Sequence, residues 1–259
     1  MTLASLSIDS LQPLLICFTR VIALLASMPV FGGQVPRQVL LGLAVLLTGL
    51  IFPAAQTHLP RNAFAPLFLA LLVANETLLG IMLGFAARLI FTAVEFGGTV
   101  VGYQMGFAAA NVYDPQNQRQ VALVSQFQNV FAILVFLALD GHHIFIRALV
   151  DSYDLLPPGL FDFSGGAVPY LMELTSHMFV LAIRFSAPVL AVMLLSSLVL
   201  GILARVFPQL NVFLLSFPIN IALAFIVLGL TMNSVVYLLQ REFSALDGQF
   251  HQLYQLLGK

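Results

Sequence analysis

The stretch VFPQLNVFLLSFPINIALAFIVLGLTMNSVVYLLQ, from Val206 to Gln240, decides the fold class of this chain, because it contains no charged residue. A helix that spans the hydrocarbon core of a bilayer needs about 20 consecutive apolar residues. Three more charge-free runs reach this length, at Gln38–Pro60, Gln120–Leu139 and Phe185–Ala204. The sequence therefore predicts an all-α protein with several membrane-spanning helices.

The composition of the whole chain supports this class. Of its 259 residues, 60% are hydrophobic and 8% are charged, whereas charged residues make up about a quarter of an ordinary soluble domain. The net charge of −1 leaves no basic surface to attract a nucleic-acid backbone, so we expect no nucleic-acid partner. The single cysteine, Cys17, lies in an apolar run, and we expect it to be a small buried side chain.

Six long apolar segments are separated by breaks rich in turn-forming residues. They lie at about 13–31, 38–55, 64–109, 121–150, 168–206 and 211–240. As one helix, segment 64–109 would be about 70 Å long, more than twice the hydrocarbon thickness. We expect it to kink, break or extend out of the bilayer.

The last two segments predict a hairpin around Phe207–Asn211, and its arms also exceed a bilayer in length. Pro188 and Pro218 lie inside these arms. Each proline frees a backbone carbonyl that lipid cannot satisfy, so neighbouring protein must cover it. The expected architecture is a set of long, kinked helical hairpins. The longest predicted loop, Asp151–Gly166, is acidic and proline-rich, and we expect it to be the most water-exposed stretch between spans.

Glycines and charges inside the apolar segments predict packing surfaces. Five glycines share one face of segment 64–109, which another helix can approach closely: Gly80, Gly84, Gly98, Gly102 and Gly106. Ionisable residues in apolar helices face protein or water, and six are predicted to form a buried charge network: Glu76, Arg88, Glu95, Glu173, His177 and Arg184. The simplest role of this network is to hold helices in register, and a proton relay is the alternative.

Catalytic and metal-binding motifs are missing from the sequence. It contains no H-E-x-x-H, G-x-S-x-G or P-loop pattern, so we expect neither an enzyme nor a cofactor. The segment Asp140-Gly141-His142-His143 combines a carboxylate with two imidazoles. Adjacent side chains on a helix point about 100° apart and would need a further ligand from elsewhere. We therefore predict a contact at a helix end and no metal site.

The C-terminal segment Gln240–Lys259 is predicted to be an amphipathic helix. Its apolar residues follow the spacing of one helix face: Phe243, Leu246, Phe250, Leu253 and Leu257. This face can dock on a partner, lie on the membrane surface, or simply pack as a terminal helix, and we slightly favour the partner because the segment has few basic residues.

Two classes of function fit these features. The first is a subunit of a larger helical assembly, which would supply the protein that these helices need around them. The second is a self-contained transporter with broken helices around a midplane site, which should have corresponding broken segments in both halves. Here the broken arms lie together in the C-terminal third, which favours the assembly subunit.

Several motifs resemble one known family. The segment Gly97–Gly159 contains GYQMGF, NVYDPQNQ and DGHHIFIRALVDSYDLLPPG, and it resembles the FliR family of flagellar export-gate proteins. The opening and closing motifs of that family are similar to Arg20 with MPVF at 28–31 and VP at 35–36, to RFSAP at 184–188, and to ARVFPQLN at 204–211. Related injectisome proteins usually differ at Gly102–Phe107, which favours the flagellar branch. An injectisome homologue is the alternative.

The resemblance implies a component of the flagellar type III protein export gate, in the bacterial inner membrane and within the flagellar basal body. The resemblance implies that such a protein assembles with FliP and FliQ and that these proteins together form the channel that exports unfolded flagellar subunits. It also implies contacts with FlhB and with membrane lipid. The resemblance also implies one unit with a FliP-like part at about 1–165, a FliQ-like hairpin at about 166–240 and a tail at 241–259.

The resemblance further assigns a role to the loop at 106–120, which it implies helps to plug the closed channel. The plug candidates are Phe107, Asn111, Val112, Tyr113, Asp114 and Pro115. Met105 is a candidate for a flexible seal, because methionine repacks easily around varied surfaces. An ordinary turn between helices is the alternative.

Overall fold

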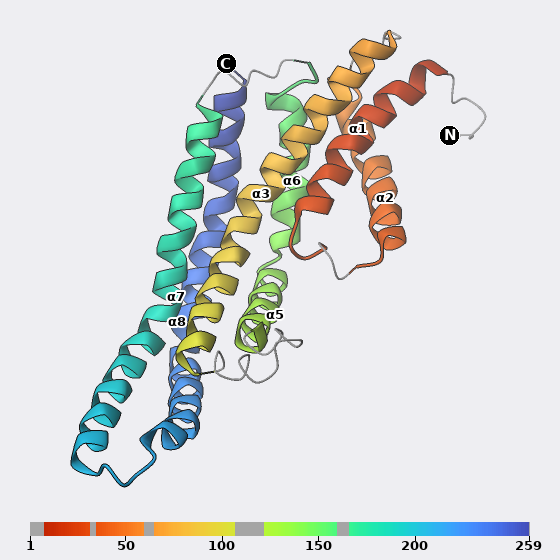
Figure 1. The fold of residues 1–259 in the computed structure, drawn as a ribbon. Coiled ribbons are helices and arrows are strands. Elements are labelled where there is room, and N and C mark those ends of the chain that lie inside the picture. The colour runs from red at the N-terminus through yellow and green to blue at the C-terminus, as the bar shows by residue number, and fades with distance from the viewer. Residues whose placement is uncertain (1–7, 32–34, 60–64, 107–121, 160–165, 259) are drawn as a thin grey trace. The chain divides into compact units, whose positions relative to one another are not determined.

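A computed structural model describes residues 8–31, 35–59, 65–106, 122–159 and 166–258. These residues form seven α-helices and no strand (Figure 1). The helices are α1 (Ile8–Ser27), α2 (Arg37–Ala55), α3 (Pro66–Gln104), α5 (Ala122–Ala138), α6 (Gly141–Leu155), α7 (Ala167–Val206) and α8 (Val212–Leu257). Four of them, α2, α3, α7 and α8, are long and apolar enough to cross a membrane, and α5 and α6 qualify only as a pair. The predicted class, an all-α multi-span membrane protein, is confirmed.

The chain divides into two compact units. Unit 1 comprises Met1–Leu89, Asp140–Leu174 and Phe243–Lys259, and unit 2 comprises Ile90–Leu139 and Thr175–Glu242. Three helices, α3, α7 and α8, contribute residues to both units.

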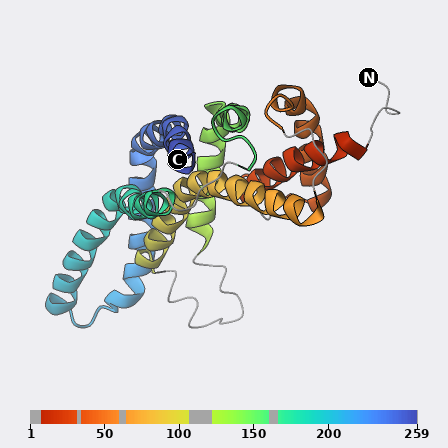
Figure 2. The same ribbon diagram turned by 90° about the horizontal axis from the view of Figure 1, so that it is seen from above.

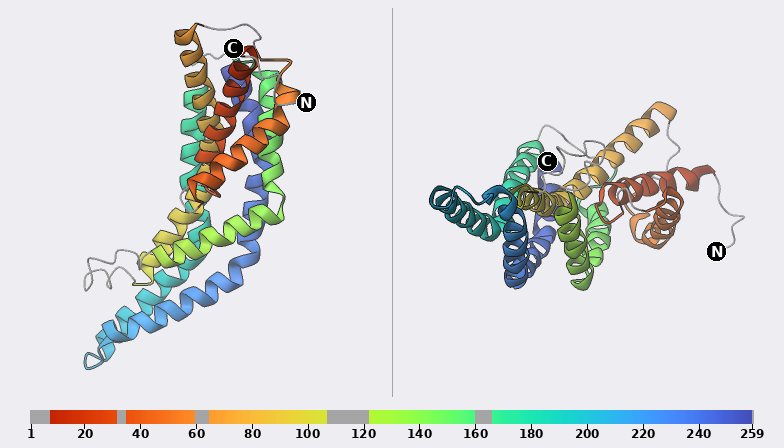
Figure 3. Two further views of the ribbon diagram at one scale, coloured as in Figure 1. Left: turned by 90° about the vertical axis from the view of Figure 1, so that its right-hand side faces the viewer. Right: turned by 60° about the horizontal axis from the view of Figure 1, so that its bottom comes forward.

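In unit 1, α1 lies between α2 and the first half of α3 (Figure 2). The C-terminal end of α8 lies beside α6 (Figure 3). Phe250 packs edge-on against Phe145 with ring centroids 5.5 Å apart, and the Tyr254 hydroxyl donates a 2.8 Å hydrogen bond to the Ala148 carbonyl. These contacts join α6 and α8 in one core.

The amphipathic C-terminal segment is the last part of α8 and not a separate helix. The five residues of its predicted apolar face are each at most 1% exposed. The predictions of a free partner-docking face and of a membrane-surface face are therefore wrong for this face, because it is already covered inside unit 1. Gly248 does not interrupt the helix, because α8 is continuous from Val212 to Leu257.

In unit 2, α7 and α8 form an antiparallel hairpin whose turn lies where it was predicted (Figure 1). Asn211 Oδ1 accepts a 3.3 Å hydrogen bond from the Leu214 amide and so satisfies one free donor at the start of α8. Ser196 Oγ donates a 2.9 Å hydrogen bond to Asn220 Oδ1 and joins the two arms. Pro188 and Pro218 lie inside α7 and α8 as expected.

The longest helices exceed the thickness of a membrane. Helices α3, α7 and α8 contain 39, 40 and 46 residues, so α8 is about 69 Å long at 1.5 Å per residue. This is more than twice the roughly 30 Å of a hydrocarbon core. The predicted excess length is confirmed, and α3 achieves it as one continuous helix.

The predicted single segment 121–150 is instead two helices. Asp140, between α5 and α6, has a left-handed backbone with φ 54°, which an α-helix cannot contain. The predicted start of the loop at Asp151 is also wrong, because α6 continues to Leu155. Its last turns are held in place by Ser152 and Tyr153, which are at most 1% exposed.

Candidate functional site

Unit 1 contains a buried ion pair between Arg20 on α1 and Glu76 on α3. The two side chains are 1% and 3% exposed. Arg20 donates through Nε to Glu76 Oε2 and through Nη2 to Oε1, the latter at 3.0 Å. This bidentate geometry is the strongest that an arginine and a carboxylate form.

Two further hydrogen bonds from Arg20 reach α6 and the residue that follows it. Nη1 donates to Ser152 Oγ at 2.8 Å and Nη2 donates to the Leu156 carbonyl at 3.1 Å. The guanidinium carbon lies 4.1 Å from the centre of the Tyr153 ring, within the range of a cation–π interaction. Arg20 therefore ties three helices of unit 1 together and uses four of its five N–H donors within this unit.

Sequence reasoning missed this cluster. Arg20 entered only as part of a family motif, and Ser152 and Tyr153 were assigned to a water-exposed loop. The available signal was an arginine inside an apolar helix, which requires an acidic partner. The sequence offers several acidic residues in apolar segments and gives no reason to choose Glu76 among them.

The first two glycines of the predicted stripe lie against α1. A Cβ atom on Gly80 would lie 2.6 Å from the Arg20 carbonyl oxygen and 2.7 Å from Ala23 Cβ. A Cβ atom on Gly84 would collide with Ser27 Oγ. Because these contacts involve backbone and the base of side chains, α1 and α3 can approach this closely only at glycine.

The other three glycines of the stripe lie in unit 2. A Cβ atom on Gly98 would lie 2.6 Å from Ser125 Cα on α5. Gly102 is buried. Gly106 has φ +92°, and a Cβ atom there would lie 2.9 Å from the ring of Phe217 on α8. The stripe therefore does not serve one partner helix but permits close contacts with α1, α5 and α8 in turn.

Met105, the candidate for the pore seal, is fully buried in the core of unit 2. It packs in an apolar cluster with Val101, Val124, Val189, Met193 and Ala224. Exposing Met105 to a pore would require this core to rearrange. The plug candidates Phe107, Asn111, Val112, Tyr113, Asp114 and Pro115 lie outside the described residues.

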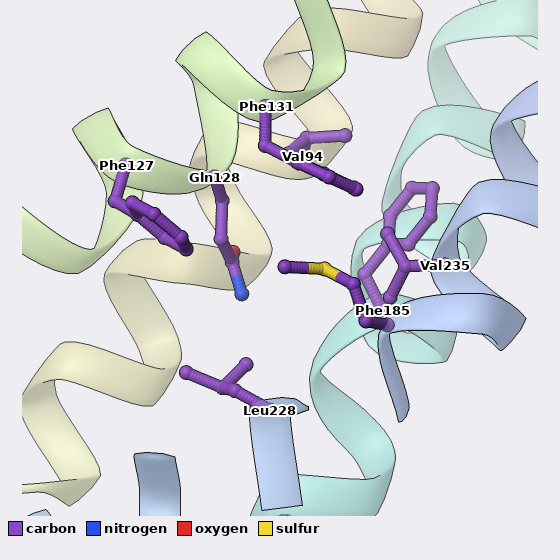
Figure 4. Close-up of a pocket in the computed structure, with 8 residues that line it drawn as sticks. Val94, Phe127, Gln128, Phe131, Phe185, Leu228 and Val235 are labelled. Carbon is purple, nitrogen blue, oxygen red and sulfur yellow. The ribbon is translucent and has the colours of Figure 1, made fainter. Parts of the chain in front are cut away.

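A small cavity in unit 2 contains one polar side chain (Figure 4). Its lining comes from α3, α5, α7 and α8: Val94, Phe127, Gln128, Phe131, Phe185, Leu228, Met232 and Val235. Gln128 extends toward the centre of the cavity in Figure 4, and its Oε1 atom is buried with no hydrogen-bond partner in the part of the chain that the structure describes. The free space is about 20 Å³, which is enough for about one water molecule.

The size of this cavity bears on the transporter hypothesis. A site for a small organic solute has a volume of about 300 to 1,000 Å³, and the Gln128 cavity is far smaller. In unit 1, an almost wholly apolar cavity of about 150 Å³ lies between α1, α2 and α6, and a wide-open groove of about 380 Å³ lies along α1 and α3. None of these three spaces combines an enclosed volume with several converging polar groups.

The polar side chains at the start of α5 have different environments. Ser125 is buried, Gln126 is exposed, and Gln128 and Asn129 are half-buried. Asn129 Oδ1, like Gln128 Oε1, is buried without a partner among the described residues. This half of α5 therefore faces protein only in part.

The six predicted network charges do not share one environment in the single chain. Glu76 is buried, whereas Arg88, Glu95, Glu173 and Arg184 are exposed. His177 Nε2 lies 3.1 Å from Oε2 of Glu242, a residue outside the predicted set whose side chain is 7% exposed. Burial of the four exposed charges requires neighbouring subunits and stays a prediction.

The predicted divergence of the two adjacent histidines is wrong. The rings of His142 and His143 have centroids 4.2 Å apart and an interplanar angle of 37°. Asp140 Oδ1 lies 3.7 Å from His143 Nδ1. The break between α5 and α6 thus brings a carboxylate and two imidazoles together.

Comparisons with known proteins agree with the motifs. The family model described as "Bacterial export proteins, family 1" matches residues 11–246. "Flagellar biosynthetic protein FliR" of Bacillus subtilis is 32% identical over 255 residues, covering 97% of this chain and 98% of that protein. The proteins of the same name from Pectobacterium carotovorum and Escherichia coli are 33% and 31% identical, covering 88% and 87% of this chain and 87% and 86% of their own lengths.

Proposed function

Because this chain belongs to family 1 of the bacterial export proteins, we propose that it is a component of the flagellar type III export gate. The observation that carries the proposal is the similarity to flagellar biosynthetic proteins along almost the entire chain. The apolar, multi-span helical fold fits a protein of this kind, since its described residues offer candidate spans and packing surfaces.

Within the gate, we propose that this chain assembles with homologues of FliP and FliQ and contacts FlhB. The exposed apolar surface of the hairpin in unit 2 supports this. The large apolar side chains that are more than half exposed include Leu194, Leu195, Leu198, Ile202, Phe213, Leu214, Phe225, Ile226 and Leu230. Large apolar patches mark protein or membrane contacts. Because α7 and α8 are longer than a bilayer is thick, lipid alone cannot cover both arms.

We propose that the protein lies in the bacterial inner membrane, within the basal body, and that its role is to form a conduit for unfolded flagellar subunits and not to catalyse a reaction. Helices that extend beyond the hydrocarbon core would then be surrounded by the neighbouring subunits. The loop at 106–120 follows directly on the core of unit 2 around Met105, and we propose that it contributes to the plug of the closed channel.

Deletion and complementation in a flagellated bacterium test the function. Loss of the chain should stop the secretion of hook and filament subunits, and expression from a plasmid should restore it. Co-purification with FliP and FliQ homologues, followed by native mass spectrometry, should yield a multi-subunit complex. A stable monomer that moves a small solute across vesicles would support the transporter instead. Restored secretion of injectisome substrates without flagellar substrates would identify an injectisome homologue.

A further inference from the structure

A carboxylate and two imidazoles meet at the start of α6, in unit 1, in a place that the proposed function does not use. One potential ligand atom from each of Asp140, His142 and His143 lies within 4.8 Å of the other two. We propose that these three residues form a binding site for a divalent transition-metal ion. The proposal does not rest on the export function.

The spacing of the donors suits a small ion. Zinc binds histidine nitrogen and carboxylate oxygen at about 2.0–2.2 Å, so neighbouring ligand atoms around a tetrahedral ion are about 3.3 Å apart. Asp140 Oδ1 and His143 Nδ1 are 3.7 Å apart. This separation is too long for a hydrogen bond but only a few tenths of an ångström longer than the distance between two zinc ligands. Since all three ligand atoms lie within 4.8 Å of one another, side-chain rotations that bring them to the zinc spacing would complete the site.

The Asp140 carboxylate is available for a ligand. Asp140 holds the N-cap position of α6, where an aspartate usually accepts a hydrogen bond from a backbone amide, but its side chain makes no such cap. It is also the only non-glycine residue with positive φ in the described ranges. A left-handed aspartate costs energy and is common where the backbone serves a site.

The imidazole rings of His142 and His143 lie next to each other. Their ring centroids are 4.2 Å apart, and His142 Nδ1 is buried without a hydrogen-bond partner among the residues described, so that atom does not fix the ring. The side chains of His143 and Asp140 are 64% and 75% exposed. An ion can therefore reach the site and keep one or more water ligands.

The donor set selects the class of ion. Two imidazoles with one carboxylate suit zinc, nickel or copper, whereas magnesium and calcium prefer oxygen ligands alone. Three protein ligands leave a fourth position for water or for a group from another subunit. Arg147 is exposed and lies one helical turn after His143, on the same face of α6. Its positive charge opposes binding, and removing it should tighten the site.

Metal titration of the full-length protein tests the site. The chain should be purified in detergent without a polyhistidine tag, together with any subunits that co-purify, and titrated with Co²⁺ by absorption and with Zn²⁺ by competition. One ion per chain should bind. D140N and H143A should each weaken binding about tenfold or more, and R147Q should strengthen it. H251A is the matched control, because His251 lies on α8 and its Nδ1 contacts the Asp247 carbonyl.

Two results would overturn the site. The first is wild-type protein that binds neither ion more tightly than about 0.1 mM. The second is equal affinity in wild type, D140N and H143A. Far-UV circular dichroism checks that the variants keep their helices. If H143A fails to fold, the comparison of D140N with wild type decides the test. Secretion assays report separately on the export function, so failure of the metal site leaves that proposal unchanged.

Discussion

Glu76 accepts hydrogen bonds from both Nε and Nη2 of Arg20, which joins α3 to α1 inside unit 1. The same guanidinium reaches Ser152 and Leu156. One buried charge thus orders helices that are far apart in the sequence. Removing one charge of the Arg20–Glu76 pair should therefore change stability differently from removing both charges.

We expect R20A or E76Q to destabilise unit 1 strongly. Breaking a buried ion pair by removing one partner costs about 3–5 kcal/mol, because the other charge stays buried and unpaired. The double variant R20M/E76L should recover most of this loss, since apolar residues of similar volume are often neutral replacements for a buried pair. Thermal unfolding or protease resistance in detergent measures the effect.

The matched control for this prediction is E95Q, because Glu95 is an exposed acid on the same helix and its neutralisation should change stability little. Equal stability of E76Q and E95Q would show that the pair does not hold α1 and α3 together.

We expect G80A and G84A to separate α1 from α3. The added Cβ on Gly80 meets the backbone of α1 at 2.6 Å, and overpacking of this kind costs about 1–3 kcal/mol. G229A is the matched control, because a Cβ at Gly229 on α8 meets nothing within 4 Å. Unfolding temperature and the yield of assembled complex are the measurements, and indistinguishable values for all three variants contradict the close contact.

We expect Q128L to be nearly neutral and Q128A to destabilise unit 2. Leucine removes a buried oxygen that has no partner in the described part of the chain while keeping most of the volume, and replacement of an unsatisfied polar group costs little. Alanine enlarges the cavity of Figure 4, which costs about 2 kcal/mol. Thermal unfolding separates the two. A Q128L variant that loses as much stability as Q128A would mean that the amide makes an essential hydrogen bond through water or a neighbouring subunit.

We expect deletion of residues 110–116 to make the closed gate leak ions. These residues lie in the proposed plug, whose loss leaves the channel without its obstruction. Conductance across the inner membrane should rise in cells that express the whole gate, compared with cells that express the undeleted chain. If conductance stays at background and secretion is unaffected, the loop is an ordinary turn between helices.

The sequence alone determined the features that follow from local pattern. The charge-free stretch from Val206 to Gln240 and the turn at Phe207–Asn211 predicted the hairpin of α7 and α8, because length, hydropathy and turn residues act over a few positions. The spacing from Phe243 to Leu257 predicted the helix that forms the end of α8. The family motifs could also be recognised from the sequence, because each is a short run of neighbouring residues.

Only the tertiary structure decided which residues meet. It paired Arg20 with Glu76 and with Ser152. The loop assignment of Ser152 from proline and acidic residues was wrong, because α6 continues to Leu155. It covered the apolar face of the C-terminal helix from within unit 1. It also brought His142 and His143 together beside Asp140, against the divergence expected on a helix. The physical reason is that charge pairing and burial depend on distances between residues remote in the chain, and that ligand geometry depends on the local backbone and side-chain conformation, whereas periodicity fixes only which face a residue occupies.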